Sequence, residues 1–181
     1  MTAKPITRPG AEAQQTIGEL CSSCALCCNG VLFGDVELQA VDNTKALKQA
    51  GLNLERKGKK HCLSQPCSCL DERNACRIYS VRPARCSSFE CLLLKRVLQG
   101  ELDMAEAKKA TRDARRQTAK VVDLLRELGQ HEEHLPLGRR YARLMAEPID
   151  LAADESIVKL RGELMVAVAR LSKILGQYFL G

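Results

Sequence analysis

The chain has 181 residues, a formal net charge of +6 and 28% charged residues. That length allows one compact domain with an extension and excludes two large domains. No apolar run is long enough for a membrane span, and the first twenty residues lack the continuous apolar stretch of a secretory signal, so we expect a cytoplasmic protein with no membrane association.

Lys and Arg outnumber Asp and Glu by ten to seven in residues 21–91 and by sixteen to thirteen in residues 92–181. Because the positive charge is not concentrated in either part, it gives little support for a nucleic-acid partner.

The first third of the chain predicts few regular elements. Residues 1–20 are expected to form a flexible tail, because Pro and Gly interrupt a polar stretch without an apolar period. Residues 31–33 are expected to form a short strand. A helix is expected to begin at Asp35 as its cap and to run to about Ala50, where Gly51 would end it.

The middle of the chain indicates a small irregular module. The basic residues 56–60 predict an exposed loop. Residues 61–78 predict an irregular hairpin, with its turn in the polar stretch 71–74. A short helix is expected from residue 92 to residue 99.

Two long amphipathic helices dominate the last part of the chain. The first is expected to open at Asp103 and stop at Gly129, and the second to begin with Asp154 as its N-cap. Between them, Pro136 and Pro148 bracket a shorter helical piece around residues 141–145. The stripe expected to be buried on the first helix is Ala114, Thr118, Val121, Val122, Leu125 and Leu128, and that on the second is Ile157, Leu160, Leu164, Val168, Leu171, Leu175 and Tyr178.

The predicted fold class is therefore mainly α. A small irregular cysteine-rich module over residues 21–91, with short strands and short helices, is followed by a C-terminal helical hairpin in an extension over residues 92–181 that packs on it.

All ten cysteines of the sequence lie between residues 21 and 91, and four of them lie within eight residues. In a reducing cytosol, such dense cysteines are more typical of metal ligands than of disulfides. Each C-x2-C step in Cys21, Cys24 and Cys27 lets two sulfurs converge on one cation, as in zinc and iron-sulfur sites. Cys28 follows Cys27 directly, and adjacent side chains diverge, so the run predicts at least two metal positions or one multinuclear centre.

A second block of cysteines runs from Cys67 to Cys91, and the two blocks are expected to meet in space. The first block departs from the bacterial ferredoxin pattern C-x2-C-x2-C-x3-C-P. Its fourth cysteine follows the third directly, without the three intervening residues, and Asn29 stands in place of the proline. An ordinary ferredoxin is therefore disfavoured.

Together the two blocks resemble the zinc- or iron-chelating cysteine-cluster family (CxxCxxCC, YkgJ-like). The second motif reads CxxL, then CxIYxxRPxxC, then Phe89 and a closing cysteine; Ser87 departs from it, where family members often have arginine. The resemblance implies a metal-binding protein whose cofactor is zinc or iron, with the iron in an iron-sulfur cluster as one form. Two zinc sites would use every matching cysteine and one four-iron cluster would use half of them, and the sequence leaves both open. The implied metal ligands are Cys21, Cys24, Cys27, Cys28, Cys67, Cys76, Cys86 and Cys91, with Cys62 and Cys69 as weaker candidates outside the motif.

The sequence has no phosphate-binding glycine loop and no nucleophile paired with a histidine in a known motif, so it favours a non-enzymatic role without deciding the question. We expect the metal to organise the fold and the helices to offer a surface to a protein partner that the sequence does not identify. The alternative is an iron-sulfur redox or methyl-transfer-associated protein, since a related cysteine motif occurs in flagellin lysine methylases. His61 is expected to be a surface residue, and Arg82 is expected to hold the turn at Pro83.

Overall fold

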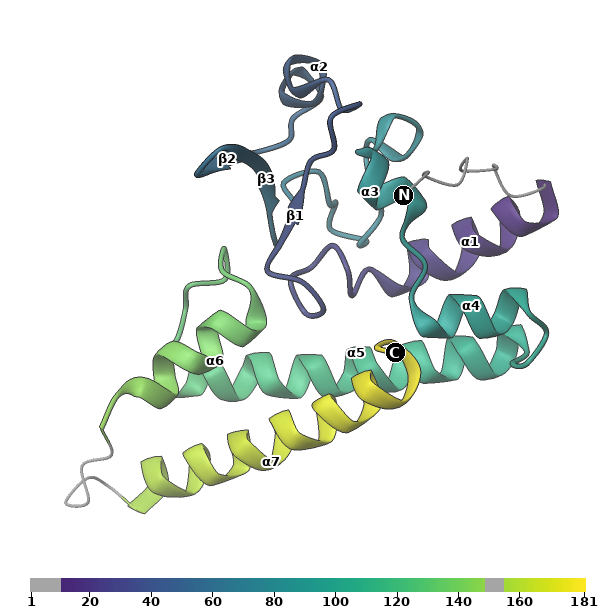
Figure 1. The fold of residues 1–181 in the computed structure, drawn as a ribbon. Coiled ribbons are helices and arrows are strands. Elements are labelled where there is room, and N and C mark those ends of the chain that lie inside the picture. Colours follow the sequence, from purple (N-terminus) through teal and green to yellow (C-terminus); the bar gives the residue numbers. More distant parts are fainter. Residues whose placement is uncertain (1–10, 149–154) are drawn as a thin grey trace.

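The computed structural model describes residues 11–148 and 155–181. Two long antiparallel helices, α5 (Met104–Glu127) and α7 (Glu155–Tyr178), form the base of the molecule, and α6 (Leu137–Ala146) lies at the end where the chain reverses. Helices α1 (Ala11–Cys24) and α4 (Leu92–Leu98) lie beside the other end of α5, and a small sheet module lies above them (Figure 1). This arrangement confirms the mainly α fold with a cysteine-rich module and a C-terminal helical hairpin. Within the described ranges, no helix combines the length and the apolar character needed to cross a membrane.

Helix α1 corrects the prediction of a flexible tail up to residue 20. The helix begins at Ala11, directly after Gly10, and its apolar side chains Ile17, Leu20 and Cys24 follow one face at helical spacing. That face packs against α5, where the Arg115 guanidinium donates to the carbonyl oxygen of Ser23 at 2.8 Å. Packing against α5 therefore stabilises a helix whose apolar periodicity in the sequence is weak. The part of the predicted tail before residue 11 lies outside the described residues.

The sheet has three antiparallel strands in the order β1-β3-β2, which are β1 (Asp35–Glu37), β2 (Leu54–Lys57) and β3 (Lys60–Ser64). Two predictions are wrong here: residues 31–33 are not a strand, and the helix predicted from Asp35 gives way to β1. The basic residues 56–60 are exposed, as predicted, and they form the tight hairpin turn between β2 and β3.

Helix α2 (Thr44–Gln49) is the short remainder of the predicted helix, and Asn43 caps it by accepting from the backbone N–H of Ala46. The chain leaves this helix through Gly51, as predicted, with a positive φ of 96°.

The segment after β3 forms the predicted irregular hairpin. Its ends meet at a bridge between Leu70 and Cys76, and the carboxylate of Asp71 accepts from the backbone N–H groups of Arg73 and Ala75 to hold the turn. A single 3₁₀ turn, η1 (Tyr79–Val81), and the short helix α3 (Ala84–Ser88) then lead to α4.

The C-terminal helices agree closely with the sequence pattern. Asp103 and Glu106 form a complete capping box at the start of α5, and α6 contains the predicted piece 141–145. The predicted stripes are buried or half-buried except at Ile157, which is 43% exposed near the start of α7, so the prediction is wrong at that residue. The predicted N-cap Asp154 lies outside the described residues.

Two separate hydrophobic cores hold the structure together. The helical core joins α1, α4, α5, α6 and α7, and its most buried side chains include Leu20, Leu93, Leu125, Leu164 and Phe179. The module core lies under the sheet and is much smaller. Its buried members are Leu38, Leu47, Leu52, Leu63, Cys69 and Ile78. Because so few residues are buried there, the sheet module depends on something beyond apolar packing.

A close contact at Gly30 fastens the cysteine-rich loop to the start of α6. The backbone N–H of Leu137 donates to the carbonyl oxygen of Gly30 at 3.0 Å, and a Cβ on Gly30 would lie 3.1 Å from the Cα of Pro136. Gly30 also has a positive φ of 81°, so both its backbone conformation and its surroundings require glycine.

We therefore expect Gly30→Ala to destabilise the protein more than Gly58→Ala. Gly58 also has a positive φ, of 62°, but a Cβ there would meet nothing within 4 Å. The Gly58 variant should lose about 1 kcal/mol of unfolding free energy from backbone strain alone, whereas the Gly30 variant should also lose the contact with Pro136. Denaturant unfolding of both variants measures the difference, and equal losses would contradict the close contact.

Candidate metal centre

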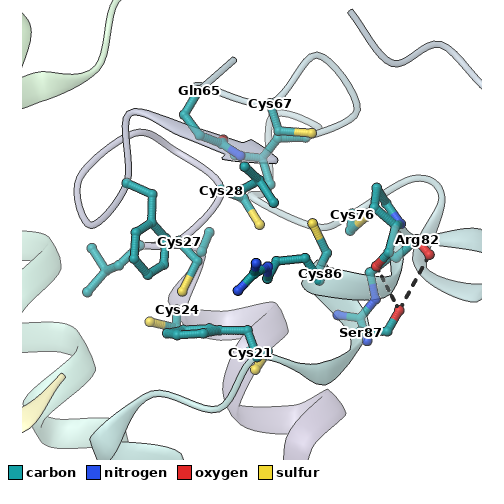
Figure 2. A pocket seen from close by; sticks show the side chains of 18 of the residues that line it. Cys21, Cys24, Cys27, Cys28, Gln65, Cys67, Cys76, Arg82, Cys86 and Ser87 are labelled. Carbon is teal, nitrogen blue, oxygen red and sulfur yellow. Dashed lines mark hydrogen bonds between the residues drawn. The ribbon is translucent and has the colours of Figure 1, made fainter. Parts of the chain in front are cut away.

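A cavity of about 460 Å³ lies between the two cores. Its walls come from α1, the loop after α1, the segment around residues 65–70, α3 and the start of α4, and Figure 2 shows the side chains that line it. All eight cysteines of the two sequence motifs line this one cavity: Cys21, Cys24, Cys27, Cys28, Cys67, Cys76, Cys86 and Cys91. The two distant blocks of the sequence therefore meet in space, as the sequence predicts.

Helix α1 and its C-terminal turn present the first block. Cys21 and Cys24 lie on successive turns of α1, and both line the cavity. The helix then ends because Ala25 takes the left-handed conformation, with φ 56°, and the backbone N–H of Cys28 bonds to the carbonyl oxygen of Ala25 at 2.8 Å. This tight turn places Cys27 and Cys28 beyond the helix, where neighbouring side chains face different parts of the cavity (Figure 2).

Loops and short helices present the second block. The backbone N–H of Cys67 donates to the carbonyl oxygen of Cys28 at 2.7 Å, which ties the two blocks together directly. Cys76 is held by its bridge to Leu70, Cys86 lies in α3, and Cys91 is the N-cap residue of α4.

Burial is the main electrostatic influence on these thiols. Removal from water raises the pKa of Cys21 and of Cys86 from 9.0 to about 12, and the pKa of Cys24 and of Cys67 to about 11. Burial likewise raises the pKa values of Cys27, Cys28 and Cys91, although the backbone N–H groups at the start of α4 oppose the shift at Cys91. A buried thiolate needs a cation to offset its loss of hydration, so these seven side chains are suited to lose their protons only to a bound metal.

Arg82 brings one positive charge to the cluster. Its guanidinium stacks on the ring of Tyr79 at 3.7 Å from the centroid, and its charge lowers the pKa values of Cys21, Cys28 and Cys86 against the larger effect of burial. From the sequence, a structural role for Arg82 at the turn before Pro83 is favoured over hydrogen bonding to the thiolates. The structure shows that its charge also acts on thiols from both blocks.

Two buried polar atoms in the cavity wall support a ligand inside it. The Nε of Arg82 and the Oε1 of Gln65 have no hydrogen-bond partner among the described residues, and Gln65 is only 2% exposed. Buried polar groups are normally hydrogen-bonded, and an Arg Nε–H is a natural donor to a thiolate or a sulfide. Eight soft thiol ligands together with an unpaired donor fit zinc, iron or an iron-sulfur cluster.

Much of the remaining wall is apolar. Phe33 packs edge-on against Phe89 with ring centroids 5.0 Å apart, and Tyr79 and Phe89 both line the cavity, as expected for an apolar cap. Leu93 and Phe179 close it from the helical side. Phe33, Gln65 and Phe179 belong to neither cysteine motif, and no local pattern in the sequence marks them as part of the site.

Cys62, Cys69 and His61 do not line the cavity. Cys69 is buried in the module core and its thiol donates to the carbonyl oxygen of Ala50 at 3.5 Å, so it has a structural partner. Cys62 is buried within β3, and His61 is exposed, as predicted.

The thiols surround the cavity without yet converging on one point. Within residues 11–148 and 155–181, no three side chains among His, Cys, Asp and Glu have the arrangement of a finished metal site. Binding of an ion must therefore draw sulfurs inward, which side-chain rotation at the cavity wall can provide.

This fold and this cavity define a small α-rich protein with eight cysteines gathered around one cavity. The profile of the CxxCxxCC family matches residues 20–119, more than half of the chain, and the protein belongs to this family, whose domain is described as zinc- or iron-chelating. The match includes the end of α1, the whole module, α4 and the first part of α5, so it crosses the predicted boundary between the cysteine module and the helical extension. Comparisons with curated proteins and with solved structures found no match.

Proposed function

We propose that this protein binds zinc or iron through the eight thiols of the cavity, and that the bound metal serves to organise the cysteine module and not to catalyse a reaction. The single observation that carries this proposal is that every cysteine of the two family motifs lines one cavity, while the two cysteines outside the motifs do not.

Energetics support an organising role for the metal. Structural zinc contributes about 10–16 kcal/mol of apparent binding free energy in zinc-finger peptides, which equals or exceeds the total stability of about 5–15 kcal/mol of a typical domain. The module core here has only six buried side chains, and its strands are three to five residues long. A contribution of that size is therefore sufficient to decide whether the module folds.

An iron-sulfur redox role is the second candidate, and the size of the cavity favours it. A volume of about 460 Å³ walled by apolar side chains is more than one bare ion requires, and a multinuclear cluster would make fuller use of it. Protein purified without oxygen distinguishes the two candidates: a brown colour and sulfide released on acidification support the cluster, and a colourless protein with bound zinc supports the structural role.

The cavity assignment is tested by comparing Cys27→Ser with Cys69→Ser. Both changes replace a buried or half-buried thiol by a hydroxyl, but only Cys27 lines the cavity. We expect Cys27→Ser to lose at least half of the bound metal, measured by elemental analysis of protein purified without oxygen, and Cys69→Ser to retain the wild-type amount. Equal metal content in the two variants would show that the cavity does not bind the metal.

A further inference from the structure

We infer that the eight thiols form two separate four-cysteine centres, one built on the helical layer and one built in the sheet module. This inference rests on the proposed function and adds to it which sulfurs share a metal. The helical centre consists of Cys21, Cys24, Cys27 and Cys91, and the module centre consists of Cys28, Cys67, Cys76 and Cys86.

The packing of the two cores separates the cysteines in this way. Cys21, Cys24 and Cys91 contact the helical core. A different set, Cys67, Cys76 and Cys86, contacts the module core. Six of the eight cavity cysteines are therefore already assigned to one core or the other by their apolar neighbours.

Cys27 and Cys28 complete the two sets because they follow the tight turn at Ala25. Their side chains diverge, so the two sulfurs are poorly placed to bind the same ion. Figure 2 shows the sulfur of Cys27 on the side of Cys21 and Cys24, and the sulfur of Cys28 on the side of Cys76 and Cys86. The hydrogen bond from Cys67 N–H to the carbonyl oxygen of Cys28 fastens Cys28 to the second set.

Arg82 brings a cation to the cavity that both sets line. It lines the same cavity as all eight thiols, and its Nε has no hydrogen-bond partner among the described residues. Four thiolates around a divalent ion leave an excess of negative charge at each centre, so two neighbouring centres repel each other. The half-buried guanidinium beside both sets of thiols would reduce that repulsion.

Paired substitutions test the division. Cys27→Ser with Cys91→Ser removes two thiols from one centre, and serine suits the N-cap position of α4. Cys27→Ser with Cys86→Ser removes the same number of thiols, one from each centre. We expect the first double variant to lose half of the metal and the second to lose nearly all of it, by elemental analysis or native mass spectrometry. Half loss in both would overturn the two-centre assignment.

A measurement on the unaltered chain covers the case in which a variant does not fold. Metal-free protein receives one half of the zinc that saturates it, free thiols are alkylated, and intact molecules are fragmented in a mass spectrometer. Protection is expected in groups of four that follow the two sets. Protection that mixes members of the two sets would overturn the assignment, and a wild-type protein that binds no metal would overturn the proposed function itself.

Discussion

Removal of the metal is expected to unfold residues 26–91 while α5 and α7 remain largely helical. The sheet module has a small core, and its cavity would be left with buried thiols and two unpaired polar atoms. The helical hairpin has its own extensive core, in which Val121, Leu125, Leu164 and Leu171 are nearly inaccessible to solvent. The metal therefore stabilises one part of the protein far more than the other.

Limited proteolysis after chelation measures this difference. Trypsin is expected to cleave the metal-free protein at module sites such as Lys48, Lys57 and Arg73, while circular dichroism retains more than half of its helical signal. Protein reloaded with metal serves as the control and should regain its resistance. An unchanged rate of cleavage in the module after complete removal of the metal would refute the organising role.

Zinc affinity is expected to fall steeply as the pH falls from 8 to 6. Every ligating thiol must lose a proton when zinc binds, and burial holds the pKa values of Cys21, Cys24, Cys67 and Cys86 at about 11 to 12. A centre of four thiols should then weaken by about ten-thousandfold for each pH unit. Competition with a chelator of known proton affinity measures the slope, and a tenfold change per unit would mean that only one thiol of the centre loses a proton when zinc binds.

The helices of the C-terminal part could be predicted because local signals and packing agree. The Asp103 and Glu106 capping box marks the start of α5, and the apolar spacing marks its buried face. Ile157 follows the same spacing, but α7 extends past the neighbouring helices there and leaves it exposed. The apolar spacing indicates which face of a helix can be buried, but it does not indicate how far the neighbouring helix extends along that face.

The N-terminal elements could not be predicted because they depend on distant parts of the chain. Helix α1 has a weak apolar stripe and is held by α5, which lies far along the sequence. Strand β1 has three residues, and its register is set by its pairing with β3, in which Val36 lies opposite Leu63. In neither segment is the local sequence signal for a helix or a strand stronger than the turn signal of the residues around it.

The cysteines of the candidate site could be predicted because metal coordination constrains their spacing in the sequence. The eight cavity cysteines follow from two motifs, since C-x2-C spacing is set by the reach of two sulfurs to one ion. Gln65 and Phe179 could not be found in this way, because one enters from the end of β3 and the other from the end of α7. Arg82 was visible in the sequence, but only its surroundings show that its charge acts on thiols from both blocks.

The contact between α1 and the C-terminal end of the chain has a consequence for how the protein acquires its metal ions during synthesis. Leu20 in α1 shares a core with Phe179, which also closes the cavity and accepts a hydrogen bond from the backbone N–H of Leu92. The ribosome therefore produces every cysteine well before the last wall of the cavity exists. The nascent thiols stay open to solvent through that interval, and the closing of α7 then encloses whatever they have captured.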